Sequence, residues 1–174
     1  MADFKIHGFE EMELMLSKLA RDAEPTARQA LREAAAVVAE RVRENIERLG
    51  EDRQAQPYPA QEYRYLPEGG RFGGVPPHQK EDLLEGLGIT KVGIDNNGDY
   101  TVKVGFEGYG SQPTAAYPQG QPIPMIARSI ESGSSIQPKQ PFFRPAVQST
   151  KKRAVETMGS VIEAAQEKIA KAGG

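Results

Sequence analysis

The sequence of 174 residues contains no cysteine and only two histidines, His7 and His78. The absence of cysteine excludes disulfide bonds, thiol nucleophiles and cysteine-ligated metal sites. Two histidines are too few for a multi-histidine metal site within one protomer. No apolar run approaches the roughly 18 residues that a membrane-spanning helix needs, and the N-terminus lacks the apolar core of a signal peptide. We therefore expect a cytosolic product with no membrane partner.

A strong charge of either sign is also lacking, because 22 Lys and Arg residues face 24 Asp and Glu residues, for a net charge of −2. The chain as a whole has no basic footprint of the kind that nucleic-acid-binding proteins carry. The motifs GxSxG, the P-loop and GxGxxG do not occur. His7 fits the surface of a short strand, and His78 lies in a rigid Pro-Pro-His segment. We expect no enzymatic activity, no cofactor and no metal.

Two amphipathic helices are predicted in the N-terminal third of the chain. The first covers residues 9–19 and follows a short strand at residues 4–7. Pro25 interrupts the apolar pattern, and a second helix is expected to begin there and to end at Gly50. The buried face of this second helix is predicted to consist of Leu31, Ala34, Val38, Val42, Asn45 and Leu49.

The segment 50–80 has no hydrophobic periodicity and is rich in proline and glycine. A loop of this length is commonly functional or disordered. Aromatic residues alternate with arginines in it, as in Tyr63-Arg64-Tyr65 and Arg71-Phe72. This composition is enriched in protein interfaces and also resembles a stacking surface for single-stranded nucleic acid, although nearby acidic residues cancel its charge. A loop ordered by neighbouring subunits, a flexible connection and a nucleic-acid surface all remain open.

The clearest β signal follows this loop. Two strands, at residues 89–94 and 100–106, flank Asn97-Gly98, which is expected to supply the positive φ angles of a hairpin turn. A second irregular loop covers 107–124, and a short helix is predicted at 125–130. The expected fold is α+β: a small antiparallel β-sheet (a hairpin meander) packed against two long helices, with long irregular loops, in a single domain of residues 1–174.

The segment Pro141–Ala146 reads Pro-Phe-Phe-Arg-Pro-Ala and opens the last predicted helix, which extends to about Ala170. Pro145 suits the first turn of a helix. At least one of Phe142 and Phe143 is expected to fill the core where this helix docks, the alternative being an exposed docking motif. The predicted buried stripe of the helix is Val147, Ala154, Met158, Val161, Ala165 and Ile169.

Three segments resemble parts of a known family, the small head–tail joining or tail-completion (neck) proteins of lambda-like siphophages. The segment at residues 9–14 is similar to the family's opening GhxELxxxL helix, and that at residues 82–87 stands where the family has a GxLxxSI turn. Pro141–Ala146 resembles the family's PFLRPA and is the strongest match. The sequence departs from the family after the second strand, where residues 106–110 are an approximate counterpart of its Glu-Phe-Gly-Thr segment.

The resemblance implies a structural virion protein that forms a homo-oligomeric ring, expected to be a hexamer, at the head–tail junction. Its partners would be the portal-side head-completion and tail-tube proteins, with DNA passing through the channel without sequence-specific binding. Assembly would take place in the host cytoplasm. A non-catalytic assembly factor or a nucleic-acid-binding module that uses the loop aromatics is the alternative. The expected interface residues are Tyr63, Arg64, Tyr65, Phe72, Phe142, Phe143 and Arg144.

Overall fold

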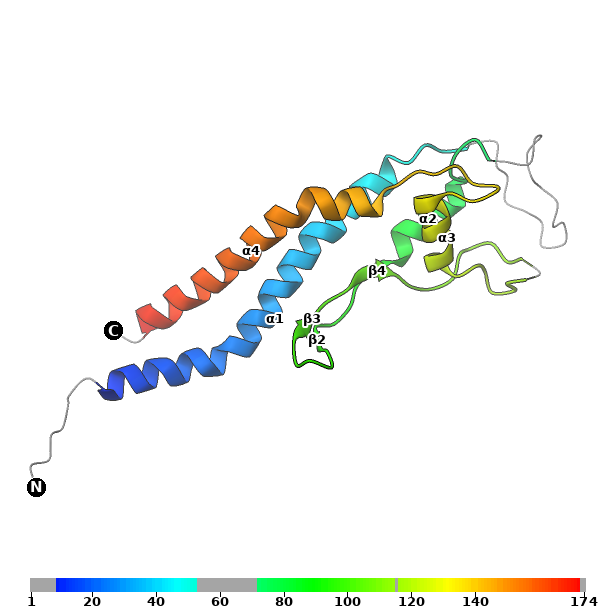
Figure 1. Ribbon diagram of the computed structural model, residues 1–174. Coiled ribbons are helices and arrows are strands. Elements are labelled where there is room, and N and C mark those ends of the chain that lie inside the picture. The colour runs from blue at the N-terminus through cyan, green and yellow to red at the C-terminus, as the bar shows by residue number, and fades with distance from the viewer. Residues whose placement is uncertain (1–8, 53–71, 115, 173–174) are drawn as a thin grey trace, which may run out of the picture.

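The computed structural model describes residues 9–52, 72–114 and 116–172, with the backbone alone for residues 9–22. Two long helices lie side by side and antiparallel (Figure 1). The elements in chain order are α1 (Phe9–Glu47), α2 (Pro77–Gly86), β1 (Leu87–Ile89), β2 (Gly93–Ile94), β3 (Tyr100–Thr101), β4 (Val104–Phe106), α3 (Ile123–Ser132) and α4 (Phe143–Ala172). The helices α2 and α3 lie against one end of the pair, and the hairpin that carries β2 and β3 reaches back along α1, where Arg28 donates to the Val92 carbonyl at 2.7 Å. The predicted α+β class, with small antiparallel sheets, is confirmed.

The prediction of two N-terminal helices separated at Pro25 is wrong, because α1 is one helix of 39 residues with Pro25 inside it. An internal proline removes one helical hydrogen bond and crowds the preceding turn, and helices often bend there without ending. The N-terminal part of α1 runs in a different direction from the rest of the helix (Figure 1). Residues that favour helix dominate both sides of the proline and carry the helix across it: glutamate, leucine, methionine and alanine before it, and alanine, glutamate and arginine after it.

The hydrophobic core lies where α1, α2, α3 and the start of α4 meet. Of the predicted face of α1, Ala34, Val42 and Leu49 are buried, whereas the other three positions are half-buried. Ile46 is fully buried and was not part of the predicted face. The remaining buried apolar side chains of this core are Val75, Leu83, Ile123, Ile126, Ala127, Ile130, Phe142 and Ala146.

The predicted stripe of α4 is correct along most of the helix and wrong at its start. Ile169 is buried, and Ala154, Met158, Val161 and Ala165 are half-buried. Val147 is 40% exposed, and the neighbouring Ala146 is buried in its place. The preceding turn sets this orientation, because Phe142 enters the core and brings the residue one helical turn later to the same side.

The predicted hairpin forms, but a bulge divides it into two short ladders. Leu87 pairs with Phe106 and Ile89 with Val104, whereas Gly93 pairs with Thr101. Three residues on the first strand therefore lie opposite two on the second, which is the geometry of a β-bulge. The amide of Thr90 still donates to the carbonyl of Lys103 at 2.9 Å across the break.

The hairpin turn differs from the predicted one, because only Gly98 of the Asn97-Gly98 pair has a positive φ, at 87°. The Gly98 amide donates to the Asp95 carbonyl, and the Asp95 carboxylate accepts the amides of Asn97 and Asp99 at 2.9 and 3.0 Å. Aspartate at the first position stabilises such a turn through these bonds, so Asn97 does not need the left-handed conformation.

The ends of the predicted 50–80 loop are ordered and lie side by side. The Asp52 amide donates to the Val75 carbonyl at 2.9 Å, and the Val75 amide donates to the Gly50 carbonyl at 2.8 Å. The loop prediction is wrong at its C-terminal end, because α2 begins at Pro77. Proline suits the first turn of a helix, where an amide would have no helical partner. The predicted short helix at 125–130 is confirmed as part of α3.

Candidate interaction site at the start of the last helix

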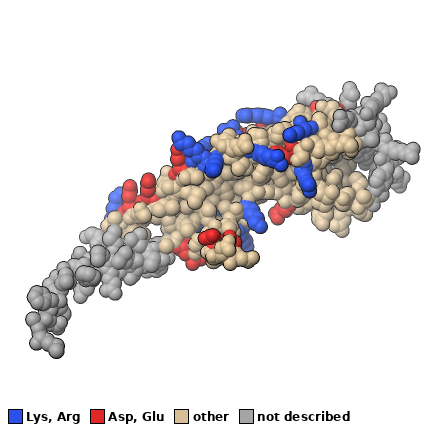
Figure 2. All heavy atoms as spheres, in the orientation of Figure 1, with Lys and Arg blue, Asp and Glu red and all other residues tan. Residues whose placement is uncertain are grey.

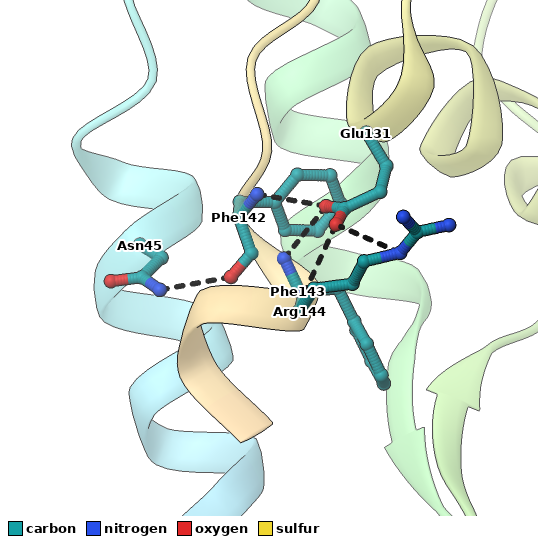
Figure 3. A network of polar contacts seen from close by, with 5 residues as sticks. All are labelled: Asn45, Glu131, Phe142, Phe143 and Arg144. Atoms are coloured by element: carbon teal, nitrogen blue, oxygen red, sulfur yellow. Dashed lines mark hydrogen bonds and ion pairs between the residues drawn. The ribbon is translucent and has the colours of Figure 1, made fainter. Parts of the chain in front are cut away.

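The carboxylate of Glu131, near the C-terminal end of α3, caps the start of α4. One of its oxygens accepts the amides of Phe142 and Phe143, each at 2.8 Å, and the other accepts the amide of Arg144 at 3.1 Å (Figure 3). The first turn of a helix has amides without helical partners and carries partial positive charge. The next residue is Pro145, which has no amide. The polar groups at this helix end are thereby satisfied by a side chain from another helix.

Two amide side chains tie the same segment to α1 and to the residues that follow it. The Asn45 side chain donates to the carbonyl of Phe142 at 2.8 Å (Figure 3). The side chain of Gln140 accepts the Gly50 amide at 2.8 Å and donates to the Gly50 carbonyl at 3.1 Å. The chain entering α4 is therefore fixed to both α1 and α3, and the orientation of the long helices relative to the rest of the protomer is set here.

The two phenylalanines of this segment have different environments. Phe142 is 1% exposed and packs against Phe106 of β4, edge to face, with ring centroids 5.9 Å apart. Phe143 is half-buried and lies 6.1 Å from the same Phe106 ring. Edge-to-face pairs are favoured by the aromatic quadrupole, beyond the area that they bury. The expectation that at least one phenylalanine fills the core is met by Phe142.

A groove of about 410 Å³ lies beside these rings. Aromatic carbon from Phe106, Phe142 and Phe143 lines it together with two arginines, Arg128 of α3 and Arg144 of α4. Both arginines are exposed, and the Arg144 side chain retains 77% of its accessible surface. The distance from its Nε to the Glu131 carboxylate is 3.9 Å, the outer limit of an ion pair. The groove thus offers two accessible guanidinium groups beside an apolar floor, a combination that suits an acidic partner with an apolar side chain.

The structure brings together three of the seven predicted interface residues, Phe142, Phe143 and Arg144. Phe72 is 7% exposed and lies elsewhere, with its amide donating to the Ile136 carbonyl at 2.8 Å. The other three predicted residues, in the segment 63–65, lie outside the residues that the structure describes.

Sequence reasoning did not identify Glu131, Gln140 or Arg128 as part of this site. Glu131 follows the last buried residue of α3 and precedes the amides that it accepts by more than ten residues. A local capping motif would have shown itself by a short, fixed spacing, whereas this cap depends on how α3 and α4 pack. Asn45 could have been identified from the sequence. It was assigned to the buried face of the helix, and a buried amide side chain requires a hydrogen-bond partner.

A second polar cluster lies on α2 and binds the backbone of the 107–124 loop. Asp82 is 4% exposed, and its carboxylate accepts the Ser111 amide at 2.9 Å. One turn earlier, burial lowers the pKa of His78 below its usual range, although the nearby charges of Asp82 and Glu81 act in the opposite direction. The described ranges contain no group of three or more acidic or histidine side chains placed to hold a metal.

No protein-family model, curated protein or solved structure matches this chain. Across the described part of the chain, no helix is both long enough and apolar enough to cross a membrane.

Proposed function

We propose that this protein is a structural component of a tailed-phage virion that forms a ring around the DNA channel at the head–tail junction, as a neck, tail-completion or tail-terminator protein. The observation that carries the proposal is the segment Pro141–Ala146, which resembles the PFLRPA segment of siphophage neck proteins. The proposed partners are further copies of the chain in a hexamer, the portal-side head-completion protein and the tail-tube protein. DNA passes through the ring without sequence-specific binding.

The position of this segment supports the proposal on physical grounds. A closed ring requires each subunit to present its two contact surfaces at one fixed angle. Pro141–Ala146 begins α4, and it is held by Glu131 of α3 and Asn45 of α1. A loose connection here would let α4 shift relative to α1 and α3. The polar network and the buried Phe142 restrict that motion.

The outer surface of α4 gives further support. Val147, Val155 and Ile162 are 40%, 62% and 39% exposed. At about 100° per residue they fall within roughly 80° of arc on one side of the helix. The three side chains therefore line one side of α4, where a neighbouring subunit in the proposed ring would cover them.

The experiment is to inactivate the gene in its phage and to examine the lysate by electron microscopy. We expect full heads and free tails side by side, with joined particles restored when the wild-type protein is supplied. A matched variant replaces Tyr63, Arg64 and Tyr65 by alanine, which we expect to reduce joined particles without lowering the melting temperature. Normal particles without the gene, or the absence of heads or of tails, would contradict the joining function.

A further inference from the structure

The hairpin tip, formed by Ile94, Asp95 and Asp99, is chemically complementary to the groove beside Arg128 and Arg144. Every residue from Gly93 to Asp99 is exposed, and Ile94 retains 58% of its accessible surface although it is a large aliphatic side chain. Within the described residues, the Asp99 carboxylate has no hydrogen-bond or ion-pair partner. The tip therefore presents one unpartnered carboxylate, a second partly used one on Asp95, and an exposed apolar side chain.

The groove has the opposite charge and an apolar floor. The Glu131 carboxylate beside it already accepts three amides, so it has little capacity left to pair with Arg144. Arg128 has no ion pair among the described residues. Figure 2 shows blue side chains around α3 and the first half of α4, and red side chains at the hairpin tip with blue ones beside them. The complementarity therefore concerns the three residues of the tip and the two arginines of the groove, not whole faces of the molecule.

We propose that the hairpin tip of one copy docks into the Arg128/Arg144 groove of the next copy, with Ile94 on the aromatic floor and Asp99 against the guanidinium groups. The contact is heterologous, because each copy contributes its tip to one neighbour and its groove to the other. Repetition of such a contact generates a ring when the rotation closes. The proposal rests on the proposed ring function and assigns the surfaces that build the ring.

The expected strength of one such contact is low. Exposed ion pairs contribute about 0.2–1 kcal/mol each and are screened by salt. Ring closure makes further contacts intramolecular and strengthens the assembly without new surfaces. The isolated protein is therefore expected to show the contact transiently, so a method that traps short-lived complexes is required.

Disulfide trapping suits this chain because it contains no cysteine of its own. Asn96→Cys, in the exposed turn beside the tip, and Ser132→Cys, at the exposed rim of the groove, are made in separate chains, mixed at low salt and oxidised, so that Ile94 and Asp99 both remain in place. The control is Ser160→Cys, which is exposed on α4 and lies outside this groove. We expect the Asn96→Cys and Ser132→Cys chains to form a mixed dimer several-fold faster than the Asn96→Cys and Ser160→Cys chains.

Charge reversal tests the assigned pairing. Asp99→Arg in the Asn96→Cys chain should slow cross-linking several-fold, and Arg128→Asp in the Ser132→Cys chain should restore it. Equal rates for the groove and control cysteines, or no rescue by the second reversal, would overturn the proposal. Cross-linking without a requirement for the gene in head–tail joining would refute the proposed function alone. A gene required for joining with no specific cross-link would refute the docking contact alone, and would point to a different partner for the groove.

Discussion

Removal of the Glu131 carboxylate tests the role of this side chain in holding α4. In Glu131→Ala the amides of Phe142, Phe143 and Arg144 lose their acceptor, and the first two are partly buried. A buried amide left without a partner costs about 1–3 kcal/mol. The third amide is exposed and regains a hydrogen bond from water. Allowing for partial relaxation, we expect the free energy of unfolding to fall by about 2–4 kcal/mol.

The change is measured by urea titration and by thermal melting. For a chain of this size, each kcal/mol lowers the melting temperature by about 2–4 °C, so the expected decrease is about 5–15 °C. Glu131→Gln keeps one acceptor oxygen and loses the charge, and its stability should lie between those of wild type and Glu131→Ala. Glu163→Ala is the matched control, because Glu163 is exposed on α4 and its loss should change stability by less than about 0.5 kcal/mol.

The result that would refute this reasoning is a Glu131→Ala variant within about 0.5 kcal/mol of wild type. That outcome would mean that water or another side chain satisfies the start of α4 equally well. A Glu131→Gln variant less stable than Glu131→Ala would also contradict it, because the amide oxygen should retain part of the cap.

Three further changes are expected to have defined effects. Phe142→Ala should lower the free energy of unfolding by about 3–5 kcal/mol in urea titrations, and Phe143→Ala by less, because Phe143 is half-buried; equal losses would argue against the two assigned environments. Gly120→Ala should destabilise by about 1–3 kcal/mol, since Gly120 has φ 94° and an added Cβ would collide with the Gly110 carbonyl; a neutral effect would exclude this close approach. Burial lowers the pKa of His78 in the folded protein. The stability that the buried neutral imidazole contributes is therefore fully present above the usual histidine pKa, and it is lost as the pH falls through the folded-state pKa. His78→Gln should therefore weaken the fall in stability between about pH 7 and 5, and an unchanged pH profile would count against burial of the neutral imidazole.

Sequence patterns predicted correctly those elements that are determined by residues close together in the sequence. The hairpin follows from alternating apolar residues around Asn97-Gly98, and α3 follows from its compact apolar spacing. The entrance to α4 follows from Pro145, although the first helical residue is Phe143. These features depend on neighbours in sequence, which is why composition and periodicity were sufficient.

The features that were wrong or missed depend on tertiary contacts. Pro25 is a local signal for a helix end, yet α1 continues through it. The proline removes one helical hydrogen bond, and the hydrogen bonds of the helical turns on either side outweigh that loss. Glu131 has no unusual local pattern, and its role appears when α3 places it at the start of α4. The resemblance directed attention to Pro141–Ala146, but the residues that hold this segment come from α1 and α3.

The central proposal is a ring at the head–tail junction, and a cryo-EM map of the neck of the native particle tests it most directly. We predict that the map contains a closed ring of this chain around the channel, with α1 and α4 recognisable as an antiparallel helix pair in every subunit. A purified particle whose neck contains no density for this chain would contradict the proposal.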